Sequence, residues 1–494
     1  MQTNASPDNF SESNRPLFLA HFMPWYQTPN VSGYWGWHWT MNHFDPEKMN
    51  ADGRREIASH YYPLTGPYDS MDEDNLEYQV LLMRLAGIDG VLVDWYGMED
   101  FWDYAVLNQS THALFAAAQK AKLLFAIVYE DQTIKHMVDN QHLSQSDALA
   151  HGAQVMKYMQ DNWFESDTYV KLANRPVLLN FGPQYFAKSS DWETMFAGLT
   201  NPPLFFTLDN RLAPAATGAY PWPPMWKANS SGILTRKSLD EYLNMFYQKA
   251  SRWDYLVTGA FPAFNDIYEE AGLGYGYGVL DPENGDTFRA TLQQAIDHDP
   301  DIIQLVTWND YGEGTIIEPT EEFGNQYLKM VQDARSLIDS AFTFQHEDLR
   351  LPLRIYTLRK ENKGDMQINS SLDNVFDLVI SGAIDEATGI VNSISGSTRI
   401  HDAQQNPGSF FLLQNYPNPF NPRTIIRYSI PTPMKVKISF YNIAGQLVKV
   451  LVNEYKNAGH HEAALGAENL SSGLYFYKMT AGRFSMTRKC LRIQ

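Results

Sequence analysis

Short apolar runs alternate with amphipathic stretches along most of the chain, and this pattern predicts strands separated by helices. The runs are rich in Val, Ile, Leu and Phe, as expected of strands that are buried on both faces of a parallel sheet. Eight such strands are predicted at residues 17–22, 88–93, 123–128, 176–180, 204–208, 219–222, 255–260 and 302–307. The clearest helices between them are predicted at residues 75–86, 114–122, 142–164 and 239–252. This order favours a single (β/α)8 barrel over a doubly wound sheet.

The pattern changes after the barrel. Residues 351–360 and 371–394 carry apolar side chains at helical spacing, a Ser, Gly, Asn and Gln-rich stretch follows, and the last part alternates apolar and polar side chains in short runs. The predicted organisation is a flexible N-terminus (1–15), the barrel (16–345), a helical extension packed on it (346–394), a linker (395–407) and a small antiparallel β-sandwich (408–494).

Polar and aromatic side chains follow the predicted strands at their carboxyl ends, where a barrel of this kind places its catalytic groups. They are Trp25, Tyr26, Asp94, Trp95, Tyr129, Glu130, Asn180, Asp209 and Asp310. Any one of them could be an ordinary loop or helix-capping residue. Because they recur after strand upon strand, we expect a binding or catalytic site at this end of the barrel.

The sequence WNDYGEGT, directly after the last predicted strand, is the strongest candidate for chemistry. It holds two carboxylates, Asp310 and Glu313, three residues apart on a turn broken by glycine. Hydrolysis of a glycosidic bond needs such a pair, one as a protonated acid and one as a base or nucleophile. An isolated pair with this spacing is more often a solvated loop. Here Trp308, Asn309 and Tyr311 add rings that stack on sugars and an amide that binds hydroxyls, which favours a carbohydrate site.

Composition and charge support two regions of different character. The chain has 494 residues with 12 Trp, 28 Tyr and a net charge of −19. Residues 408–494 contain 11 Lys and Arg, three Glu and no Asp. Their charge of +8 leaves −27 on the remainder, and such a switch marks a domain boundary. The acidic part should repel the phosphates of nucleic acid, so we expect no nucleic-acid partner.

Several protein classes are disfavoured. Cys490 is the only cysteine, so no intrachain disulfide can form, and no apolar run is long enough to span a membrane. A metal-dependent hydrolase would use His21, His38, Asp94 or Glu130, but the chain has no H-x-H or H-E-x-x-H spacing. We therefore expect neither metal nor cofactor. The polar N-terminus has no apolar signal sequence, so the protein is either cytoplasmic or an export signal has been removed.

The barrel sequence resembles glycoside hydrolase family 99 and its relative family 71. The resemblance is carried by AHFMPWY from Ala20, HYYPLTGPYDS from His60, AGIDGVLVDWYG from Ala86 and the stretch Trp308–Pro319. Family 99 contains endo-acting α-mannosidases and family 71 contains α-1,3-glucanases, and both are (β/α)8 barrels with an acidic pair on this loop. The resemblance implies a glycoside hydrolase that cleaves α-mannan or α-1,3-glucan.

Carried over by position, the resemblance makes Asp310 and Glu313 the catalytic pair. The expected substrate-binding set is Asn309, Tyr26, Trp25, Trp95, Asp94, Tyr129, Glu130, Trp308 and Tyr311. Family 99 usually has Glu in place of Asp310, so this chain is intermediate between the two families. The shorter side chain leaves room for a water molecule, as inverting enzymes need. We therefore expect inversion, with Glu313 as acid and Asp310 as base.

The tail resembles the C-terminal sorting domain of the bacterial type IX secretion system. The resemblance is carried by LQNYPNPFNP from Leu413, by Tyr441, Asn442 and Gly445, and by SGLYF from Ser472. It implies a secreted or surface-bound enzyme from a Bacteroidetes-like organism, with the secretion machinery as a partner and its signal peptide removed. Separately, we expect the protein to be a monomer. The alternative class is a non-catalytic carbohydrate-binding barrel, which the presence of both Asp310 and Glu313 disfavours.

Overall fold

The computed structural model describes residues 15–494 apart from 51–52, 403–410, 413–414, 416–417, 419, 467–469, 483 and 493–494. Within these residues the chain divides into two units, Met1–Thr388 and Gly389–Gln494. No helix in the described part of either unit is long and apolar enough to cross a membrane.

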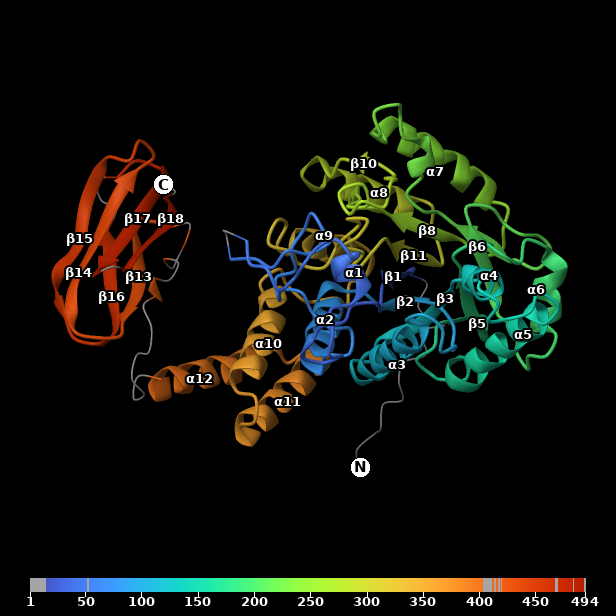
Figure 1. The fold of residues 1–494 in the computed structure, drawn as a ribbon, viewed down its shortest axis with the longest axis horizontal. Coiled ribbons are helices and arrows are strands. Elements are labelled where there is room, and N and C mark those ends of the chain that lie inside the picture. The colour runs from blue at the N-terminus through green and yellow to red at the C-terminus, as the bar shows by residue number, and fades with distance from the viewer. Residues whose placement is uncertain are drawn as a thin grey trace. The chain divides into compact units, whose positions relative to one another are not determined.

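Eight parallel strands of the described chain form the barrel of the first unit (Figure 1). They are β1 (Leu17–Phe22), β2 (Gly90–Trp95), β3 (Leu124–Tyr129), β5 (Arg175–Asn180), β6 (Leu204–Leu208), β7 (Gly218–Tyr220), β8 (Val257–Ala260) and β11 (Ile302–Leu305). Their order is β7-β6-β5-β3-β2-β1-β11-β8, and each bonded pair is parallel. The predicted (β/α)8 barrel is confirmed, with every strand within about two residues of its predicted place.

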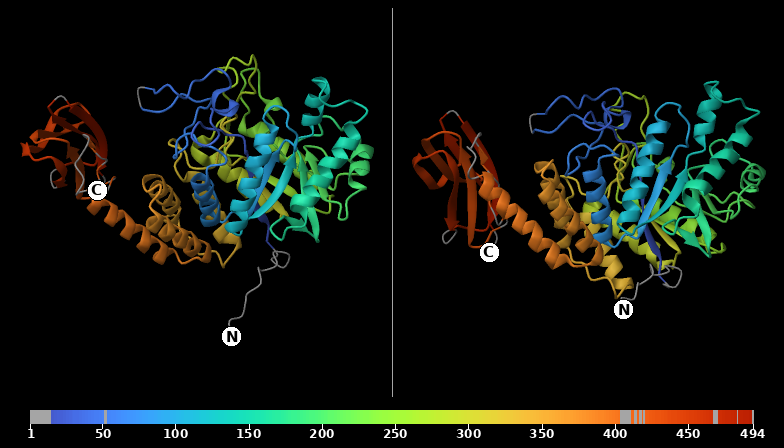
Figure 2. Two further views of the ribbon diagram at one scale, coloured as in Figure 1. Left: turned by 60° about the horizontal axis from the view of Figure 1, so that its bottom comes forward. Right: turned by 90° about the horizontal axis from the view of Figure 1, so that it is seen from below.

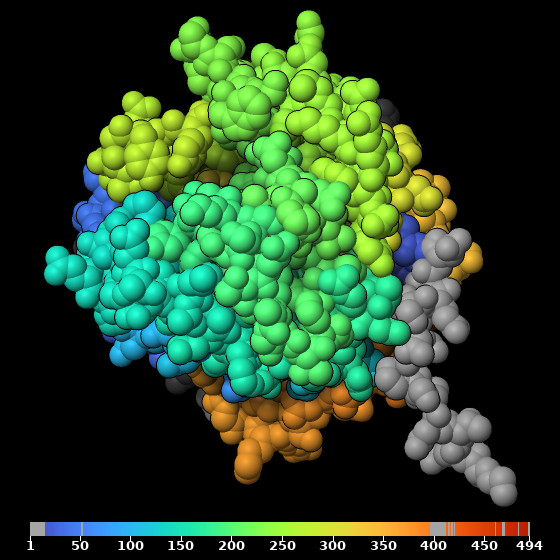
Figure 3. Space-filling model, turned by 90° about the vertical axis from the view of Figure 1, so that its right-hand side faces the viewer, coloured from blue at the N-terminus to red at the C-terminus, as the bar shows by residue number. Residues whose placement is uncertain are grey.

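Helices cover the outside of the barrel in the views of Figures 1 and 2. They are α2 (Glu73–Ala86), α3 (Tyr104–Lys120), α4 (Gln132–Asp139), α5 (Ala148–Met159), α6 (Ser189–Phe196), α7 (Arg236–Ala250), α8 (Asp286–Asp297) and α9 (Gln326–Ile338), with a short α1 (Trp37–Thr40) in the first loop. Figure 3 shows the face that α4 to α7, teal to green, form over the barrel. The predicted helix 142–164 contains α5 and a π-helical turn at Gln160–Phe164.

Helix α2 shows how the sequence sets the position of the first loop. The Asp72 side chain accepts hydrogen bonds from the backbone of Asp74 and Asn75, which caps the first turn. Gly87 ends the helix at φ 78°, a left-handed conformation that glycine adopts without strain. The start of α2 therefore lies at the end of the barrel where the strands finish, directly after the long loop that follows β1.

Three helices follow the barrel: α10 (Leu351–Glu361), α11 (Met366–Ser381) and α12 (Ile384–Asp402). The single helix expected at 371–394 is two, because Gly382 at φ 84° ends α11. Helix α10 packs on α2, where Arg359 bonds Glu77 at 3.0 Å. Helix α12 continues to Asp402, into the stretch predicted as a linker, and residues 403–407 of that linker lie outside the described residues.

The second unit contains two antiparallel sheets, as predicted. One has the order β12-β13-β16 and the other β15-β14-β17-β18. Their strands are β12 (Phe411–Leu412), β13 (Arg423–Ile430), β14 (Met434–Asn442), β15 (Leu447–Lys456), β16 (Gly459–Gly466), β17 (Gly473–Ala481) and β18 (Phe484–Arg492). Inward-facing residues such as Ile426, Ile438 and Tyr477 alternate with exposed ones and form one apolar core, in which Cys490 is also buried.

Candidate active site

The loop after β11 is folded tightly on itself. The Thr307 hydroxyl donates to the carbonyl of Thr315 at 2.8 Å and accepts the backbone N–H of Asp310, also at 2.8 Å. The N–H of Glu318 donates to the carbonyl of Trp308 at 3.0 Å. These bonds close the turn and fix the backbone that carries both carboxylates.

Gly314 is required for this turn. It has φ +69°, and a Cβ atom there would lie 2.7 Å from the carbonyl oxygen of Asn265. Asn265 belongs to the loop after β8, and its N–H donates to the Glu313 carbonyl at 2.8 Å. The close approach of the two loops therefore fixes the backbone that carries Glu313.

Asp310 and Glu313 interact directly, and their environment raises both pKa values. The N–H of Glu313 donates to Asp310 Oδ1 at 2.9 Å. Burial raises the pKa of Asp310 to about 7, against the backbone hydrogen bonds that favour its ionised form. Burial, and then the charge of Asp310, raise the pKa of Glu313 well above its usual value. Glu313 Oε2 is enclosed and has no hydrogen-bond partner among the described residues. The two carboxyls therefore differ in how readily they lose a proton, as a donor and an acceptor of protons on one turn would need.

Two more carboxyls, from β2 and the end of β3, join the pair. Burial raises the pKa of Asp94 to about 8, with a further contribution from the charge of Asp310 and an opposing hydrogen bond from Tyr96. The pKa of Glu130 is raised well above its usual value by burial and then by Asp94. Gln132 donates to Glu130 at 2.8 Å. Three strand ends thus bring four acidic groups into one electrostatic cluster, as predicted for the top of the barrel.

Trp25 borders this cluster. Its ring stacks on His38 at a centroid distance of 4.1 Å and lies 6.2 Å from the ring of Tyr96, the residue that bonds Asp94. Burial lowers the pKa of His38 to about 3, so the ring stays neutral. Neither Tyr96 nor His38 was among the expected site residues. Tyr96 could have been found from period-two alternation, because it points the same way as Asp94.

Asn309 and Tyr26 hold the loop rather than face the substrate. The Asn309 amide accepts from Met23 N–H at 2.8 Å and donates to the Met23 carbonyl and to Tyr68 Oη, both at 3.0 Å. The Tyr26 hydroxyl donates to the Asn309 carbonyl at 2.8 Å and accepts the N–H of Tyr311 at 3.1 Å. Both side chains are fully buried. The amide of Asn309 is already bonded to Met23 and Tyr68. Asn309 therefore holds the loop in position, in place of the substrate contact expected from the sequence.

Tyr311 and Trp308 belong to a buried network around Glu318, which sequence reasoning missed. Glu318 accepts hydrogen bonds from Tyr311 at 2.6 Å, from Tyr68 at 2.8 Å and from Gln79 at 3.1 Å. Burial raises the pKa of Glu318 to about 7 against these bonds and one from Trp308. The aromatic side chains of the loop therefore point into the protein and tie the loop to α2.

Trp95 and Tyr129 do not join the carboxylates. The Trp95 indole N–H donates to Asn108 in α3 at 3.1 Å, and its ring stacks on Tyr158 with centroids 5.8 Å apart. Tyr129 packs on Trp192 of α6. Successive side chains of a strand point to opposite faces, so Asp94 faces inward and Trp95 outward. The expectation of sugar contacts from these two residues is corrected accordingly.

Histidines and acidic residues do not form a metal site in the described part of the chain: no group of three or more potential ligands is arranged to hold an ion. His21 lies inside the barrel with its ring edge against Trp222 at 4.8 Å. Burial lowers its pKa to about 3.

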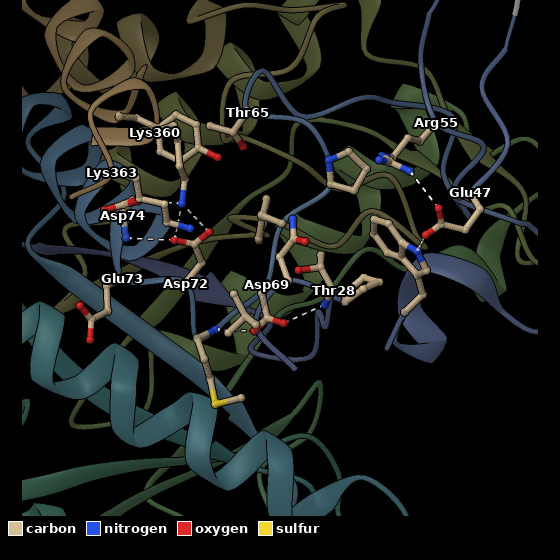
Figure 4. A pocket seen from close by; sticks show the side chains of 18 residues that line it. Thr28, Glu47, Arg55, Thr65, Asp69, Asp72, Glu73, Asp74, Lys360 and Lys363 are labelled. Atoms are coloured by element: carbon tan, nitrogen blue, oxygen red, sulfur yellow. Dashed lines mark hydrogen bonds and ion pairs between the residues drawn. The ribbon is translucent and has the colours of Figure 1, made fainter. Parts of the chain in front are cut away.

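A pocket of about 680 Å³ lies beside the site, between the loop after β1, the start of α2 and α10 (Figure 4). Lys360 lies at its wall and bonds Asp72 and Asp74, each at 2.7 Å. Asp69 accepts the N–H of Thr28 at 2.7 Å. The bonds of Lys360 tie α10 to the start of α2, and the bond of Asp69 holds the first loop on itself.

Known proteins are similar to both parts of the chain. Residues 414–494 match the family model of the secretion system C-terminal sorting domain. The chain is 25% identical over 381 residues to a glycoprotein endo-alpha-1,2-mannosidase-like protein of Danio rerio, covering 66% of this chain and 76% of the relative. The protein of the same description from Mus musculus is 23% identical over 332 residues, covering 60% and 68%. Among solved structures, the family 99 endo-alpha-mannosidase of Bacteroides thetaiotaomicron is similar with 19% identity and a TM-score of 0.49, covering 66% of this chain and 98% of that one.

The barrel and these relatives indicate a domain similar to glycoside hydrolases. More particularly, the chain joins a catalytic domain like that of glycoside hydrolase family 99 to a C-terminal sorting domain of the type IX secretion system. The sorting domain indicates a secreted or cell-surface enzyme.

Proposed function

We propose that the barrel hydrolyses an α-linked polysaccharide, with Glu313 as general acid and Asp310 as general base. The observation that carries this proposal is the unequal pair on one turn. Burial and the neighbouring Asp310 keep the proton on Glu313, whereas the pKa of Asp310 is about 7. Two carboxyls whose pKa values are made different in this way supply one donor and one acceptor of protons at the same pH.

In the proposed reaction, Glu313 donates its proton to the glycosidic oxygen while the bond from that oxygen to the anomeric carbon breaks. Asp310 takes a proton from a water molecule, and the water oxygen bonds to the opposite face of the anomeric carbon. The sugar is released with inverted configuration, and the proton balance is restored when Asp310 and Glu313 exchange protons with solvent. Asp310, a methylene shorter than Glu, leaves room for this water.

Two substrates are consistent with the sequence and the relatives. The relatives are described as endo-alpha-1,2-mannosidase-like, which favours an α-mannan. The string Asn309-Asp310-Tyr311-Gly312-Glu313 is more similar to family 71, which favours an α-1,3-glucan. We also propose that Trp25, Asp94 and Glu130 contact the sugar at the point of cleavage, since they border the catalytic pair.

The test is hydrolysis of yeast-type α-mannan and α-1,3-glucan, followed by chromatography of the products. The wild-type enzyme should release oligosaccharides from one of them. Asp310→Asn and Glu313→Gln should each be slower by about 10² to 10⁴-fold, the usual cost of losing a general acid or base. Glu269→Gln, which changes an exposed carboxylate on the loop after β8, is the matched control and should retain full activity. The proposal fails if either loop variant retains more than about a tenth of wild-type turnover.

A further inference from the structure

Exposed aromatic rings gather at one end of the barrel. Among the described residues of the first unit, Trp and Tyr side chains exposed by more than a third all lie in loops that follow barrel strands. They are Tyr34 (46%), Trp37 (38%), Trp102 (61%), Trp226 (70%), Tyr275 (50%) and Tyr277 (50%). Large rings left in water are costly, and an exposed group of them at one place marks a binding surface.

The strand order places these rings on both sides of the candidate catalytic loop. Neighbouring strands run in the order β2, β1, β11, β8. Strand β7 is at the other end of the bonded path and contacts β8 where the barrel closes. Tyr34, Trp37 and Trp102 follow β1 and β2, on one side of β11. Trp226, Tyr275 and Tyr277 follow β7 and β8, on the other side. In both views of Figure 2 the long blue loop after β1 and the yellow-green loop after β8 rise from the same side of the barrel.

On the β8 side, ring contacts lead from solvent to the catalytic pair. The exposed rings of Tyr275 and Tyr277 lie 5.5 and 5.9 Å from the ring of Tyr268. The Tyr268 ring lies beside Gly312, between the two acidic residues of the loop: a Cβ atom at Gly312 would lie 3.6 Å from this ring and 3.5 Å from Asp310 Oδ1. In agreement, the pKa of Tyr268 is raised well above its usual value by burial and then by the charges of Glu313 and Asp310. We name these three tyrosines the β8 ring group.

On the other side, two similar paths reach Asp94. Trp102 contacts Tyr104 at 5.8 Å, and Tyr104 stacks on Tyr96 at 5.6 Å. Trp37 contacts His38 at 4.9 Å, and His38 stacks on Trp25. Both paths end at the Tyr96 side chain that bonds Asp94. The exposed ends of these paths, Trp37 and Trp102, are named the β2 ring group.

We propose that the β8 and β2 ring groups form the outer parts of one polysaccharide-binding surface, which holds sugar units on both sides of the bond that is cleaved. The inference rests on the proposed function. Stacking on a flat ring suits the apolar face of a pyranose and makes few demands on linkage, so it fits a long chain that must lie across the cleavage site. A site that trimmed single sugars from a chain end would need such rings on one side only.

Two double variants test the surface: Tyr275→Ala with Tyr277→Ala, and Trp37→Ala with Trp102→Ala. In the Asp310→Asn background, which holds substrate without turnover, each pair should weaken retention by yeast α-mannan or α-1,3-glucan in affinity electrophoresis by about ten-fold. Tyr455→Ala, which removes an exposed ring of the second unit, is the control and should not change retention.

In the active enzyme, each double variant should lower kcat/KM on the polysaccharide about ten-fold more than on an aryl glycoside of one or two sugars. Equal losses on long and short substrates, or unchanged retention in either double variant, would overturn the proposal. The proposal would also be overturned if the Asp310→Asn protein bound neither polysaccharide. Binding without hydrolysis by the wild type would instead overturn the proposed reaction and leave the binding surface supported, so the two failures are distinguishable.

Discussion

The interiors of the two units differ in the groups they bury. The barrel unit encloses the carboxyls Asp94, Glu130, Asp310 and Glu318, and burial raises the pKa of each. In the described part of the second unit, the buried polar side chains are Asn415, Thr424, Ser429, Ser439 and Arg492, without a carboxyl. The rest of that core is apolar.

This difference indicates that the groups suited to proton transfer lie in the barrel unit and not in the described part of the sorting unit. A buried carboxyl costs stability, because desolvation penalises its charged form, and such groups persist where their reactivity is used. The sorting unit carries no such cost among its described residues. Its carboxylates Glu454 and Glu462 are exposed. We expect substitutions of buried acidic residues in the barrel to alter catalysis and its pH dependence, and equivalent changes in the tail to alter neither.

Outside the proposed catalytic pair, the largest effect is expected when the hydrogen-bond network around Glu318 is broken. Glu318→Ala leaves the hydroxyls of Tyr68 and Tyr311 without their acceptor, so the loop shifts, and a shift of about 1 Å can cost on the order of 10²-fold in kcat. Glu318→Gln keeps one acceptor and should recover part of the loss. Glu462→Ala, which removes an exposed carboxylate paired with Arg427, should change neither kcat nor stability measurably. Steady-state kinetics would contradict this account if Glu318→Ala kept wild-type kcat.

The next effect concerns the pH dependence of activity. In the proposed reaction Asp310 must be ionised to act as base, and burial raises its pKa to about 7. Below this pH, kcat/KM should therefore fall about tenfold per pH unit. At alkaline pH it should fall again, as Glu313 loses the proton that it must donate. A profile that stays flat down to pH 5 would mean that Asp310 has an ordinary pKa and that burial does not set its reactivity.

The sequence predicted the fold and the acidic cluster because both depend on simple periodic patterns. The apolar runs marked the strands, and the carboxyl ends of parallel strands necessarily meet at one end of a barrel. That argument placed Asp94, Glu130, Asp310 and Glu313 at one end, and in the structure the charges of these groups act on one another. For each of these residues it was enough to know that it lies in the last part of a strand or in the loop that follows it.

The orientation of side chains was harder to predict. Trp95 and Tyr129 are adjacent to site residues in sequence but point outward, since neighbours on a strand alternate. Asn309 and Tyr311 have the polar groups of a sugar site, yet those groups bond Met23, Tyr68 and Glu318. Only the three-dimensional structure shows these bonds, because their partners are distant in the sequence.

A smaller effect is expected on thermal stability. The folded pKa values of Asp310 and Glu318 are about 7 and that of Asp94 is about 8, all above the values of an unfolded chain near 4. The folded barrel therefore binds more protons than the unfolded chain, and its stability falls as pH rises through 7 and 8. Calorimetry should show a barrel Tm lower at pH 8.5 than at pH 6.5 by roughly 5 °C. A higher Tm at pH 8.5 would contradict this sign.

The smallest effect is expected from removal of the tail. Deleting residues 408–494 should leave kcat/KM of the barrel within about twofold of the full chain, since a separate domain with its own core folds independently. The same deletion should abolish export in a host with type IX secretion. An insoluble or inactive truncated protein would show that the two units depend on each other for folding or catalysis.

The central claim is that Glu313 and Asp310 cleave an α-glycosidic bond by direct attack of water. Proton NMR of the reaction in progress tests it most directly, because the anomeric proton of the first-formed reducing end reports its configuration before mutarotation. The account predicts that the β-anomer is released first from an α-linked substrate. Release of the α-anomer first, or no new reducing end from either glycan, would contradict it.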